Sequence, residues 1–348
     1  MRWLDKMTRS FFWRPTGCLP SLASLNISHG LTARWEMAPE AIGQGQSCHP
    51  LTVVELADGK VIGDLRLAAT RQDLVVGGVQ SVFGCDDLQN HFALRRRRFR
   101  LPHYCRGTAL LLGTSNSDNY YHWLLDVLPR WKILQAATLS PYDFVLLPGR
   151  PSRFQDETLD VLGVPPAKRL RCSKNFVHQF ERLVVPAMPF PVEKVAPWVC
   201  AWVRSLFPEK GSGPEKLYLS RRGACRRPLV DELALENALS SRGFAIVHTD
   251  QMSVLEQVQL FSSARFVVAP HGAALTNMIF APAGAKMLEL FHPQHKNRCY
   301  VNLARACGHW YAGLDGEATC AVKARLLGYE MNVSAVVEMI EEQHKFVL

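Results

Sequence analysis

The sequence predicts an α/β protein with a β-rich N-terminal portion and a doubly wound parallel sheet in its C-terminal part. Two patterns carry this prediction. Short apolar runs separated by turn residues crowd residues 50–112, and beyond residue 211 short apolar strands alternate with helices, the order typical of a parallel sheet. Of the 348 residues, 48% are hydrophobic and 20% are charged. This composition excludes a disordered or collagen-like chain, and the length suits two domains or one large one.

The N-terminal domain is expected to span residues 1–210. Its first strands flank Asp58-Gly59, a dipeptide typical of the turn in a β-hairpin. Pro129 should kink or end a helix, because proline lacks the backbone N–H that a helix interior uses. The expected strands lie at 51–56, 61–62, 74–76, 79–83, 109–112, 144–147 and 182–185, and the expected helices at 120–137, 156–162 and 198–207.

A linker without apolar residues, Lys-Gly-Ser-Gly-Pro at 210–214, places a domain boundary at about residue 211. The C-terminal domain is expected to span 211–330, and 331–348 to form a final amphipathic helix. Within this domain we expect strands at 217–220, 244–248, 265–269, 286–291 and 309–311, alternating with helices at 231–242, 253–263, 272–280 and 297–307.

The chain is basic, with a formal net charge of +9, which favours anionic partners. Much of the excess lies in Arg95–Arg98 and in a second cluster that contains Arg221, Arg222, Arg226 and Arg227. A nucleic-acid binder is not favoured, because aromatic residues are not interleaved with the basic run. The cysteines are scattered and form no CxxC pair, so we expect reduced thiols. His292 and His295 have no partner at ligand spacing, so no metal site is expected.

No apolar run approaches the roughly 20 residues that a membrane helix needs. Residues 2–14 mix aromatic and basic side chains. This segment is either an ordinary N-terminus with some core anchors or an interfacial membrane anchor. We therefore expect a cytoplasmic protein, with peripheral contact at the inner face of the membrane as a further option.

Two strand ends of the C-terminal domain carry candidate ligand-binding residues. The first strand runs into Ser220-Arg221-Arg222, where guanidinium groups could grip a diphosphate; a solvated basic loop is the alternative. Another strand runs into His271-Gly272 and then a helix, whose free N–H groups could bind phosphate; an inert strand–helix junction is the alternative. There is no GxGxxG or GxxxxGK[ST] motif, so dinucleotide and P-loop sites are disfavoured.

Carboxylates supply the other candidates. Glu289 stands near the end of a strand, where it could hold the hydroxyls of a ribose or be an ordinary exposed strand-end residue. His122 and Asp126 are four residues apart in an expected helix, so they share one face. A carboxylate beside an imidazole raises its basicity and orients it for proton abstraction. A buried histidine–aspartate hydrogen bond with a structural role is the alternative.

Together these segments resemble glycosyltransferase family 61, in particular its bacterial members described as capsular polysaccharide biosynthesis proteins. The resemblance rests on NYYHWLLDVLPR at 119–130, LYLSRR at 217–222, PHGAALTNMIF at 270–280 and MLELFHP at 287–293. It implies a GT-B architecture, in which two Rossmann-like domains face a cleft. It also implies an inverting, metal-independent transfer of a sugar from a nucleotide sugar, with UDP as the favoured nucleotide. The chain departs from the family pattern in having Asp231 in place of Asn and Ala274 in place of a second Gly.

The resemblance also implies roles for individual residues. Ser220, Arg221 and Arg222 would bind the diphosphate, and Glu289 the ribose. His122, oriented by Asp126, would deprotonate the acceptor hydroxyl, and Asp126 is the alternative base. The remaining substrate-binding residues, including those that would line the phosphate and sugar pocket, would be Asn119, His271, Gly272, Ala273, Thr276 and Asn277.

The partners that follow are a nucleotide-sugar donor and a glycan or lipid-linked glycan acceptor, with no nucleic acid, no metal and no further cofactor. The reaction would serve cell-surface polysaccharide biosynthesis. The transferred sugar, a hexose, a pentose or an N-acetylhexosamine, stays open. The alternative function is a non-catalytic nucleotide-sugar or glycan-binding module of the same fold.

Overall fold

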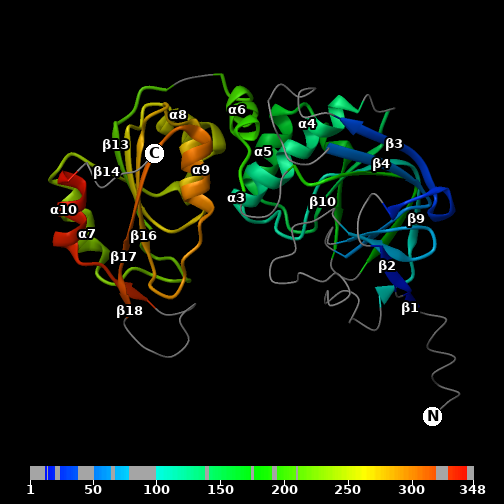
Figure 1. Ribbon diagram of the computed structural model, residues 1–348, viewed down its shortest axis with the longest axis horizontal. Coiled ribbons are helices and arrows are strands. Elements are labelled where there is room, and N and C mark those ends of the chain that lie inside the picture. Colours follow the sequence, from blue (N-terminus) through cyan, green and yellow to red (C-terminus); the bar gives the residue numbers. More distant parts are fainter. Residues whose placement is uncertain are drawn as a thin grey trace, which may run out of the picture. The chain divides into compact units, whose positions relative to one another are not determined.

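The structure is a computed structural model that describes residues 12–13, 15–19, 24–37, 51–63, 67–77, 99–137, 141–173, 176–189, 194–208, 211–318 and 328–342. The chain divides into two compact units, Met1–Val192 and Glu193–Leu348 (Figure 1). The division precedes the boundary expected at about 211, because helix α6 (Pro197–Ser205) packs against α9 (Cys299–Cys307) of the second unit. The guanidinium of Arg204 on α6 also donates a 2.7 Å hydrogen bond to the carbonyl of Ile279.

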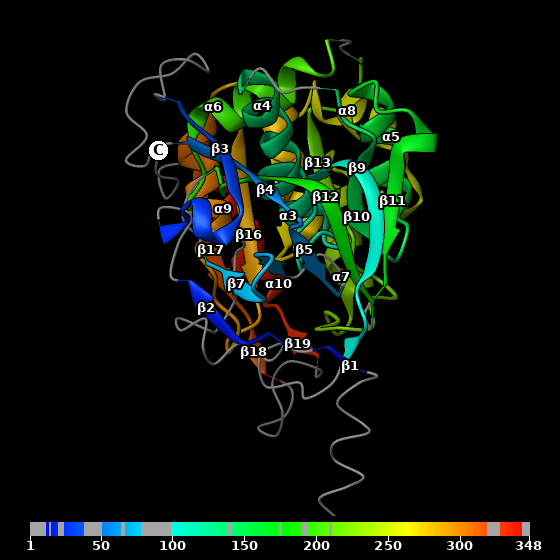
Figure 2. The same cartoon turned by 90° about the vertical axis from the view of Figure 1, so that its right-hand side faces the viewer.

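The N-terminal unit is built on a 10-stranded mixed sheet (Figure 2), which confirms the expected β-rich portion. Its parallel part pairs β11 (Arg169–Cys172), β10 (Phe144–Pro148), β9 (His103–Leu111) and β12 (Val177–Pro186) in that order. The sheet continues through β5 (Lys60–Ile62), β6 (Leu67–Ala69), β7 (Leu74–Val76) and β2 (Gly17–Leu19), while β4 (Leu51–Ala57) pairs with β12 and β3 (Leu31–Met37).

The hairpin expected at Asp58-Gly59 is wrong. Strands β4 and β5 do not pair with each other; both run antiparallel along the same strand, β12. Asp58 adopts a left-handed φ of 55° and its N–H donates to the carbonyl of Glu181 at 3.1 Å. The dipeptide therefore bends one continuous strand, as a bulge does. A Cβ on Gly59 would lie 2.7 Å from the Cβ of Leu183, so the close approach of β12 requires glycine.

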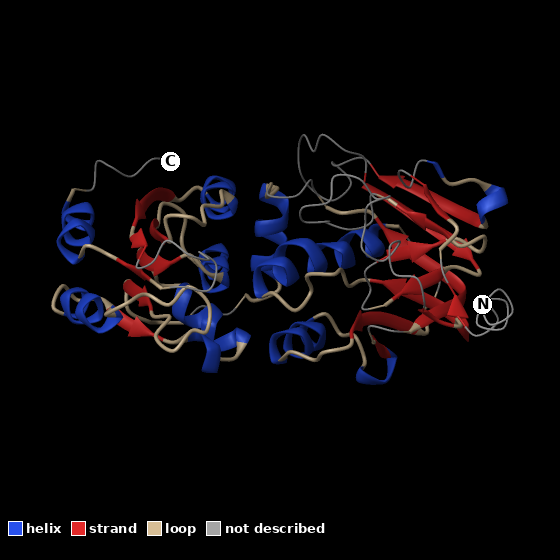
Figure 3. Ribbon diagram, turned by 90° about the horizontal axis from the view of Figure 1, so that it is seen from below, coloured by secondary structure: helices blue, strands red, loops and turns tan. Residues whose placement is uncertain are grey.

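The α-helices described in this unit lie along one side of its sheet (Figure 3). The expected helix at 120–137 is present as α3 (Tyr120–His122), a π-helical turn η5 (Trp123–Val127) and α4 (Leu128–Ala136). The widened turn lies directly before Pro129, which therefore enters α4 at its first turn, where an N–H is not needed. Helix α5 (Arg153–Val161) follows β10. The strand expected at 79–83 and the Arg95–Arg98 run lie outside the described residues.

The C-terminal unit contains a five-stranded parallel sheet in the order β14, β13, β15, β16, β17, as the alternating pattern predicted. The bounds of its elements are β13 (Lys216–Leu219), α7 (Glu232–Ser240), β14 (Ala245–Val247), α8 (Val254–Phe261), β15 (Phe266–Pro270), the 3-10 helix η8 (Ala273–Phe280), β16 (Lys286–Phe291), β17 (Trp310–Asp315) and α10 (Val333–Glu341). Figure 1 shows α7 and α10 on one face of this sheet and α8 and α9 on the other.

Small strand pairs complete the description: β1 (Phe12–Trp13) with β8 (Phe99–Arg100), and β18 (Glu317–Ala318) with β19 (Tyr329–Glu330). Each unit has its own apolar core. That of the C-terminal unit joins Tyr218, Val268 and Leu288 of the sheet to Leu235 of α7 and Val336 of α10. Across the parts of the chain that are described, no helix is both long and apolar enough to cross a membrane.

Candidate functional site

The strand order of the C-terminal unit places a candidate binding site between β13 and β15. After β13 the chain moves to β14 on one side, and it then returns to β15 on the other side of β13. Parallel sheets bind ligands beyond the carboxyl ends of their strands at such a point of reversal. The residues found there are Ser220-Arg221 after β13 and His271-Gly272 after β15. The tertiary structure thus brings together the two strand ends that the sequence singled out separately.

Arg221 joins these two strand ends. Its guanidinium donates hydrogen bonds to the carbonyl of His271 and, at 3.0 Å, to the carbonyl of Arg226. Its backbone N–H donates to Glu232 Oε1 at 2.7 Å, and the hydroxyl of Tyr218 donates to the same oxygen at 2.8 Å. Burial raises the pKa of Glu232. The loop after β13 is therefore held by a buried carboxylate at the start of α7.

The residue before Glu232 explains one departure from the family pattern. Asp231 has a left-handed φ of 53° at the N-terminus of α7. Asp and Asn are the non-glycine residues that adopt this conformation most readily. Asp231 therefore keeps the turn that an Asn would make.

Ser220 and Arg222 contact a second acidic residue of α7, Glu236. The hydroxyl of Ser220 donates to Glu236 Oε1 at 2.7 Å, and Arg222 Nη1 lies 3.5 Å from Glu236 Oε2. The Arg222 side chain is 54% exposed, so this ion pair is weak and exchangeable. The Ser220 hydroxyl thus already has a structural partner, whereas the exposed guanidinium of Arg222 can leave its weak ion pair to contact an anion.

His271 is held by a buried carboxylate. Its Nδ1 lies 2.5 Å from Glu289 Oε1, and the hydroxyl of Tyr311 donates to Glu289 Oε2 at 2.6 Å. Glu289 is fully buried. Burial, followed by the charge of Glu289, raises the pKa of Tyr311, so that its hydroxyl stays protonated as a donor. The ribose contact expected of Glu289 has no support in this geometry, because both oxygens already have protein partners and neither reaches the surface.

Thr276 and Asn277 do not line an open pocket. Both are fully buried in η8, and the Asn277 amide donates to Gln257 Oε1 of α8 at 2.7 Å. The expected pocket residues His271, Gly272 and Ala273 are partly exposed at the start of the same helix. Residues 271–273 are therefore accessible to a ligand, whereas Thr276 and Asn277 are buried and hold η8 against α8.

Two further residues at this edge were noted in the sequence but not assigned to ligand binding. Arg227 is half-buried, and its pKa is lowered by burial and by the charges of Arg221 and Arg226. His292 is 2% exposed, and its pKa is lowered by burial and by Arg227. Within the described ranges, no carboxylate forms an ion pair with Arg221, Arg226 or Arg227. The cluster of arginines in the sequence was the signal for this excess of positive charge.

The second candidate site lies in the N-terminal unit, on the helix that contains the π turn. His122 Nδ1 lies 2.6 Å from Asp126 Oδ2, which confirms the shared helix face. The Asp126 side chain is 7% exposed and that of His122 is 15% exposed, so the imidazole is the accessible partner. Asn119 caps this helix, since its Oδ1 accepts the N–H of Tyr121 at 2.9 Å. In this structure Asn119 therefore has a structural role.

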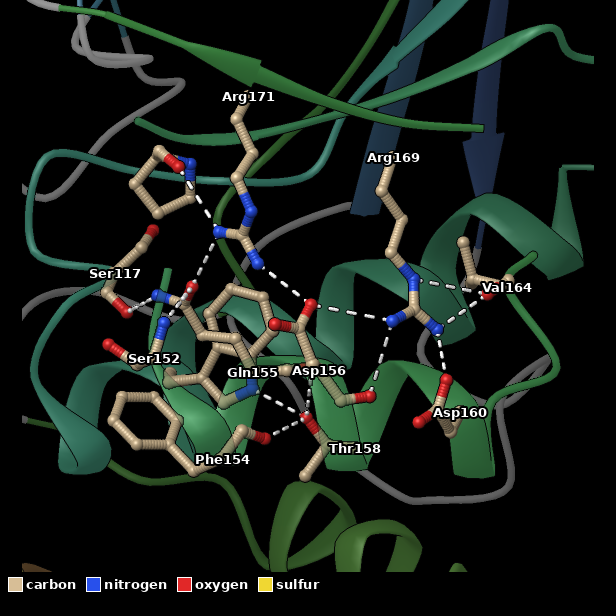
Figure 4. A network of polar contacts seen from close by, with 12 residues as sticks. Ser117, Ser152, Phe154, Gln155, Asp156, Thr158, Asp160, Val164, Arg169 and Arg171 are labelled. Carbon is tan, nitrogen blue, oxygen red and sulfur yellow. Dashed lines mark hydrogen bonds and ion pairs between the residues drawn. The ribbon is translucent and has the colours of Figure 1, made fainter. Parts of the chain in front are cut away.

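A polar network on α5 fixes the position of this helix (Figure 4). The indole N–H of Trp123, next to His122, donates to Thr158 Oγ1 at 2.8 Å. Gln155 donates to the carbonyl of Ser117 at 2.8 Å, just before the helix begins. Arg171 of β11 in turn donates to Gln155 Oε1 at 3.1 Å and to Asp156 Oδ1 at 2.7 Å. These bonds tie the His122 turn to the edge of the sheet.

Arg130 also holds the helix that carries His122 and Asp126 in place. It is fully buried, and its guanidinium donates to the carbonyls of Leu112, Gly113 and Pro186 at 3.0, 3.2 and 2.8 Å. Burial lowers the pKa of Arg130 to about 9, against the opposing effect of Asp126. The buried cation thus joins the ends of β9 and β12 to the helix that carries the histidine–aspartate pair.

Among the residues that the structure describes, no group of three or more His, Cys, Asp or Glu side chains is arranged to hold a metal ion. Independence of a metal stays a prediction. The positive charge at the carboxyl edge of the C-terminal sheet is supplied by side chains of the chain itself.

Comparison with known proteins identifies a family match over residues that include His122, Arg221 and His271. Residues 120–288 match the family model described as Glycosyltransferase 61. The EGF domain-specific O-linked N-acetylglucosamine transferase of Rattus norvegicus is 28% identical over 104 residues, which are 28% of this chain and 20% of that protein. The alignment thus spans about a fifth of that relative's length. The family match begins at the His122 helix and ends in β16, so it includes the His122–Asp126 pair, Arg221 and His271, whereas Glu289 lies just beyond it.

Proposed function

We propose that this chain, which carries a glycosyltransferase 61 domain over residues 120–288, transfers a sugar from a nucleotide sugar to a hydroxyl group of a glycan acceptor. UDP is the nucleotide that we favour. The rat relative is named for transfer of N-acetylglucosamine, which makes UDP-N-acetylglucosamine the first donor to test. The choice among an N-acetylhexosamine, another hexose and a pentose stays open.

One observation supports this proposal most directly. Arg221 bridges the point of strand reversal through its bonds to the carbonyls of His271 and Arg226, and the charges of Arg221 and Arg226 act on Arg227. Among the described residues, no carboxylate forms an ion pair with these three guanidinium groups. Guanidinium groups that are not held in an ion pair are suited to phosphate oxygens, which they bind in a bidentate manner. A diphosphate that departs with an additional negative charge is stabilised by such fixed cations. The arrangement can therefore support a leaving group without drawing on a metal ion.

A few residues of the C-terminal unit would bind the donor, each in a different role. Arg221 and Arg222 would contact the diphosphate, and the partly exposed start of η8 at Gly272 and Ala273 would offer backbone N–H groups. Glu289 holds His271 by its Nδ1, so the opposite ring nitrogen, Nε2, is the one that would face the ligand. Glu289 is thus proposed as a positioning residue for His271 and no longer as the ribose contact.

The acceptor side would use His122 and Asp126. A base beside the acceptor oxygen removes its proton as the oxygen attacks the anomeric carbon from the face opposite the diphosphate. A single such displacement inverts the configuration. Asp126 keeps the imidazole oriented through the 2.6 Å contact to Nδ1, and His122 Nε2 would accept the proton. Asp126 is the less accessible of the two and is therefore the second choice for the base.

We further propose a GT-B-like arrangement, in which the two units act as Rossmann-like halves that face a cleft. The doubly wound order of the C-terminal sheet supports this for one half. A role in cell-surface polysaccharide biosynthesis, a cytoplasmic location and contact with the inner face of the membrane remain predictions from the sequence.

The test is a thermal-shift panel of UDP, UDP-N-acetylglucosamine, other nucleotide sugars and uridine, with and without EDTA. Ligand at about 100 times its Kd should add about 2.7 kcal/mol to the stability of the folded chain. Arg221→Ala should abolish the shift. Arg265→Ala is the matched control, because Arg265 lies at the amino edge of the same sheet in an exposed pair with Glu215.

Each outcome decides a different part of the proposal. A UDP shift that survives EDTA, together with transfer to a glycan, supports the proposed enzyme. A shift that disappears with EDTA contradicts metal independence, and binding without donor turnover favours the glycan-binding module. The absence of a shift with every nucleotide would overturn the donor site.

A further inference from the structure

His292 presents a buried hydrogen-bond donor that has no acceptor among the described residues. The residue follows β16 and is 2% exposed. Its Nδ1 accepts the backbone N–H of Gln294 at 3.1 Å, so the proton of the neutral ring lies on Nε2. Nε2 is itself buried and has no hydrogen-bond partner in the described part of the chain. A buried donor without an acceptor is unfavourable and rare in folded proteins, so this nitrogen indicates a place where a ligand supplies the acceptor.

The surroundings of the ring show which kind of acceptor fits. The charge of Arg227 acts on His292 and, together with burial, lowers the pKa of the imidazole. The ring is therefore neutral at neutral pH. Tyr329 packs against it with ring centroids 5.4 Å apart, and burial keeps the Tyr329 hydroxyl protonated by raising its pKa. Among the described residues, no carboxylate forms an ion pair with His292, and the contacts that surround its ring come from Arg227 and Tyr329.

Arg227 also forms no ion pair with a carboxylate of the described residues. It is half-buried beside Arg221 and Arg226, whose positive charges lower its pKa. Holding guanidinium groups together at the edge of a protein is costly unless an anion is shared between them. The cation and the unpartnered N–H of His292 thus point to an acceptor that is negatively charged and compact.

We propose that Arg227 and His292 bind one phosphoryl group of the sugar nucleotide, Arg227 as the cation and His292 as an uncharged N–H donor. This inference rests on the proposed function for the identity of the nucleotide, but the anion site itself does not depend on it. The phosphate oxygen would satisfy Nε2 and share its charge with Arg227. His292 would thereby recognise the diphosphate without adding to the repulsion among the arginines.

The experiment is isothermal titration calorimetry of wild type, His292→Phe, His292→Gln and Arg227→Gln with UDP, uridine and inorganic pyrophosphate. His292→Phe keeps the ring but removes the donor, and the affinity for UDP should fall at least about tenfold, as expected for a hydrogen bond to a charged group. The affinity for uridine should not change. His292→Gln places an amide N–H near the position of Nε2 and should restore most of the loss. Arg227→Gln should weaken UDP and pyrophosphate alike.

A pH series separates this role from that of an imidazolium. The ratio of wild-type to His292→Phe affinity should stay constant from pH 7 to pH 8.5, because the titration of the ligand itself cancels in the ratio. A ratio that falls as the pH rises would overturn the uncharged-donor role. If His292→Phe does not fold, as judged by its melting transition, the His292→Gln and Arg227→Gln variants carry the test.

The remaining outcomes distinguish this inference from the proposed function. Undiminished UDP and pyrophosphate affinity in folded His292→Phe and Arg227→Gln would overturn the inference and leave the transferase proposal standing. Wild-type binding of pyrophosphate without UDP, lost in both variants, would support the anion site and overturn the choice of UDP. Failure of the wild type to bind either compound would overturn both.

Discussion

The guanidinium of Arg221 occupies the space that a side chain at residue 272 would fill. A Cβ on Gly272 would lie 2.9 Å from Arg221 Nη1, and that same nitrogen donates to the carbonyl of His271. The backbone of Gly272 is extended, with φ near −179°, so no unusual conformation requires glycine there. A side chain at residue 272 would instead displace the guanidinium with which Arg221, two residues after β13, reaches the end of β15.

Gly272→Ala should therefore displace Arg221 and weaken nucleotide binding. Loss of a hydrogen bond from a charged donor costs about 1.5–3 kcal/mol, so the affinity for UDP should fall about tenfold or more. Titration calorimetry measures this directly. Gly213→Ala is the matched control, because a Cβ there meets its nearest neighbour at 3.4 Å, an ordinary contact. Equal affinities of Gly272→Ala and wild type would show that Arg221 does not act at this position.

Tyr311→Phe should destabilise the C-terminal unit and disturb His271. The change removes the hydroxyl that donates to Glu289 Oε2, and a fully buried carboxylate oxygen then lacks its donor. Such a loss costs about 1–3 kcal/mol in the free energy of unfolding, measurable by urea denaturation. Tyr104→Phe, at a residue that is 50% exposed, should leave the stability unchanged. A Tyr311→Phe protein as stable as wild type would argue against a strong contact between Tyr311 and Glu289.

His122→Ala should reduce the rate of transfer about 10²–10⁴-fold while leaving the affinity for UDP unchanged. A positioned general base contributes about 10²–10⁴-fold to a rate, and His122 lies in a different unit from the cationic cluster. Asp126→Asn removes the charge that orients the imidazole and should reduce turnover by less. Initial rates with saturating donor compare the variants. Full turnover in His122→Ala with loss of turnover in Asp126→Asn would transfer the role of base to Asp126.

The stability of the N-terminal unit should decrease in mild acid through His178. Burial, followed by the charge of His103, lowers the pKa of His178 below its ordinary value of 6.5. The unfolded chain then binds more protons than the folded one as the pH falls below about 6.5, and by linkage the folded state loses stability. The His178 ring is stacked between Phe176 and Phe180, with centroids 6.3 and 6.2 Å away.

His178→Phe should continue this aromatic stack and remove the titrating group. The free energy of unfolding, measured by urea denaturation at pH 7.5 and 5.5, should fall less between these pH values in the variant than in wild type. His29→Phe serves as the control, because His29 belongs to a surface turn and is only partly buried. Identical pH dependence of wild type and His178→Phe would assign the acid sensitivity to other groups.

The local sequence pattern predicted most of the strands and helices, because the conformation of such a segment depends largely on residues that are neighbours in the chain. The alternation of strands and helices after residue 211 was found as expected, and the spacing of His122 and Asp126 placed them in contact. The strand-end positions of Arg221 and His271 were likewise readable, because apolar runs end where the polar residues begin.

The pattern failed where a distant strand decides the outcome. Asp58-Gly59 has the composition of a hairpin turn, but β12 provides hydrogen-bond partners on both sides of it and keeps the chain extended. Thr276 and Asn277 belong to a motif that suggests ligand contact, yet η8 packs against α8 and buries both. Neither the pairing of β12 beside Asp58-Gly59 nor the burial of Thr276 and Asn277 can be read from the neighbouring residues in the sequence.

The sequence by itself determined the succession of strands and helices, the position of the basic residues at strand ends and the shared face of His122 and Asp126. Each of these follows from periodicity and spacing within a few residues. Only the tertiary structure decided that Glu289 contacts His271, that Tyr311 completes this contact, and that the Nε2 of His292 is buried without an acceptor among the described residues. The reason is that hydrogen bonding and burial depend on which strands become neighbours, and strand order is set by packing of the whole sheet.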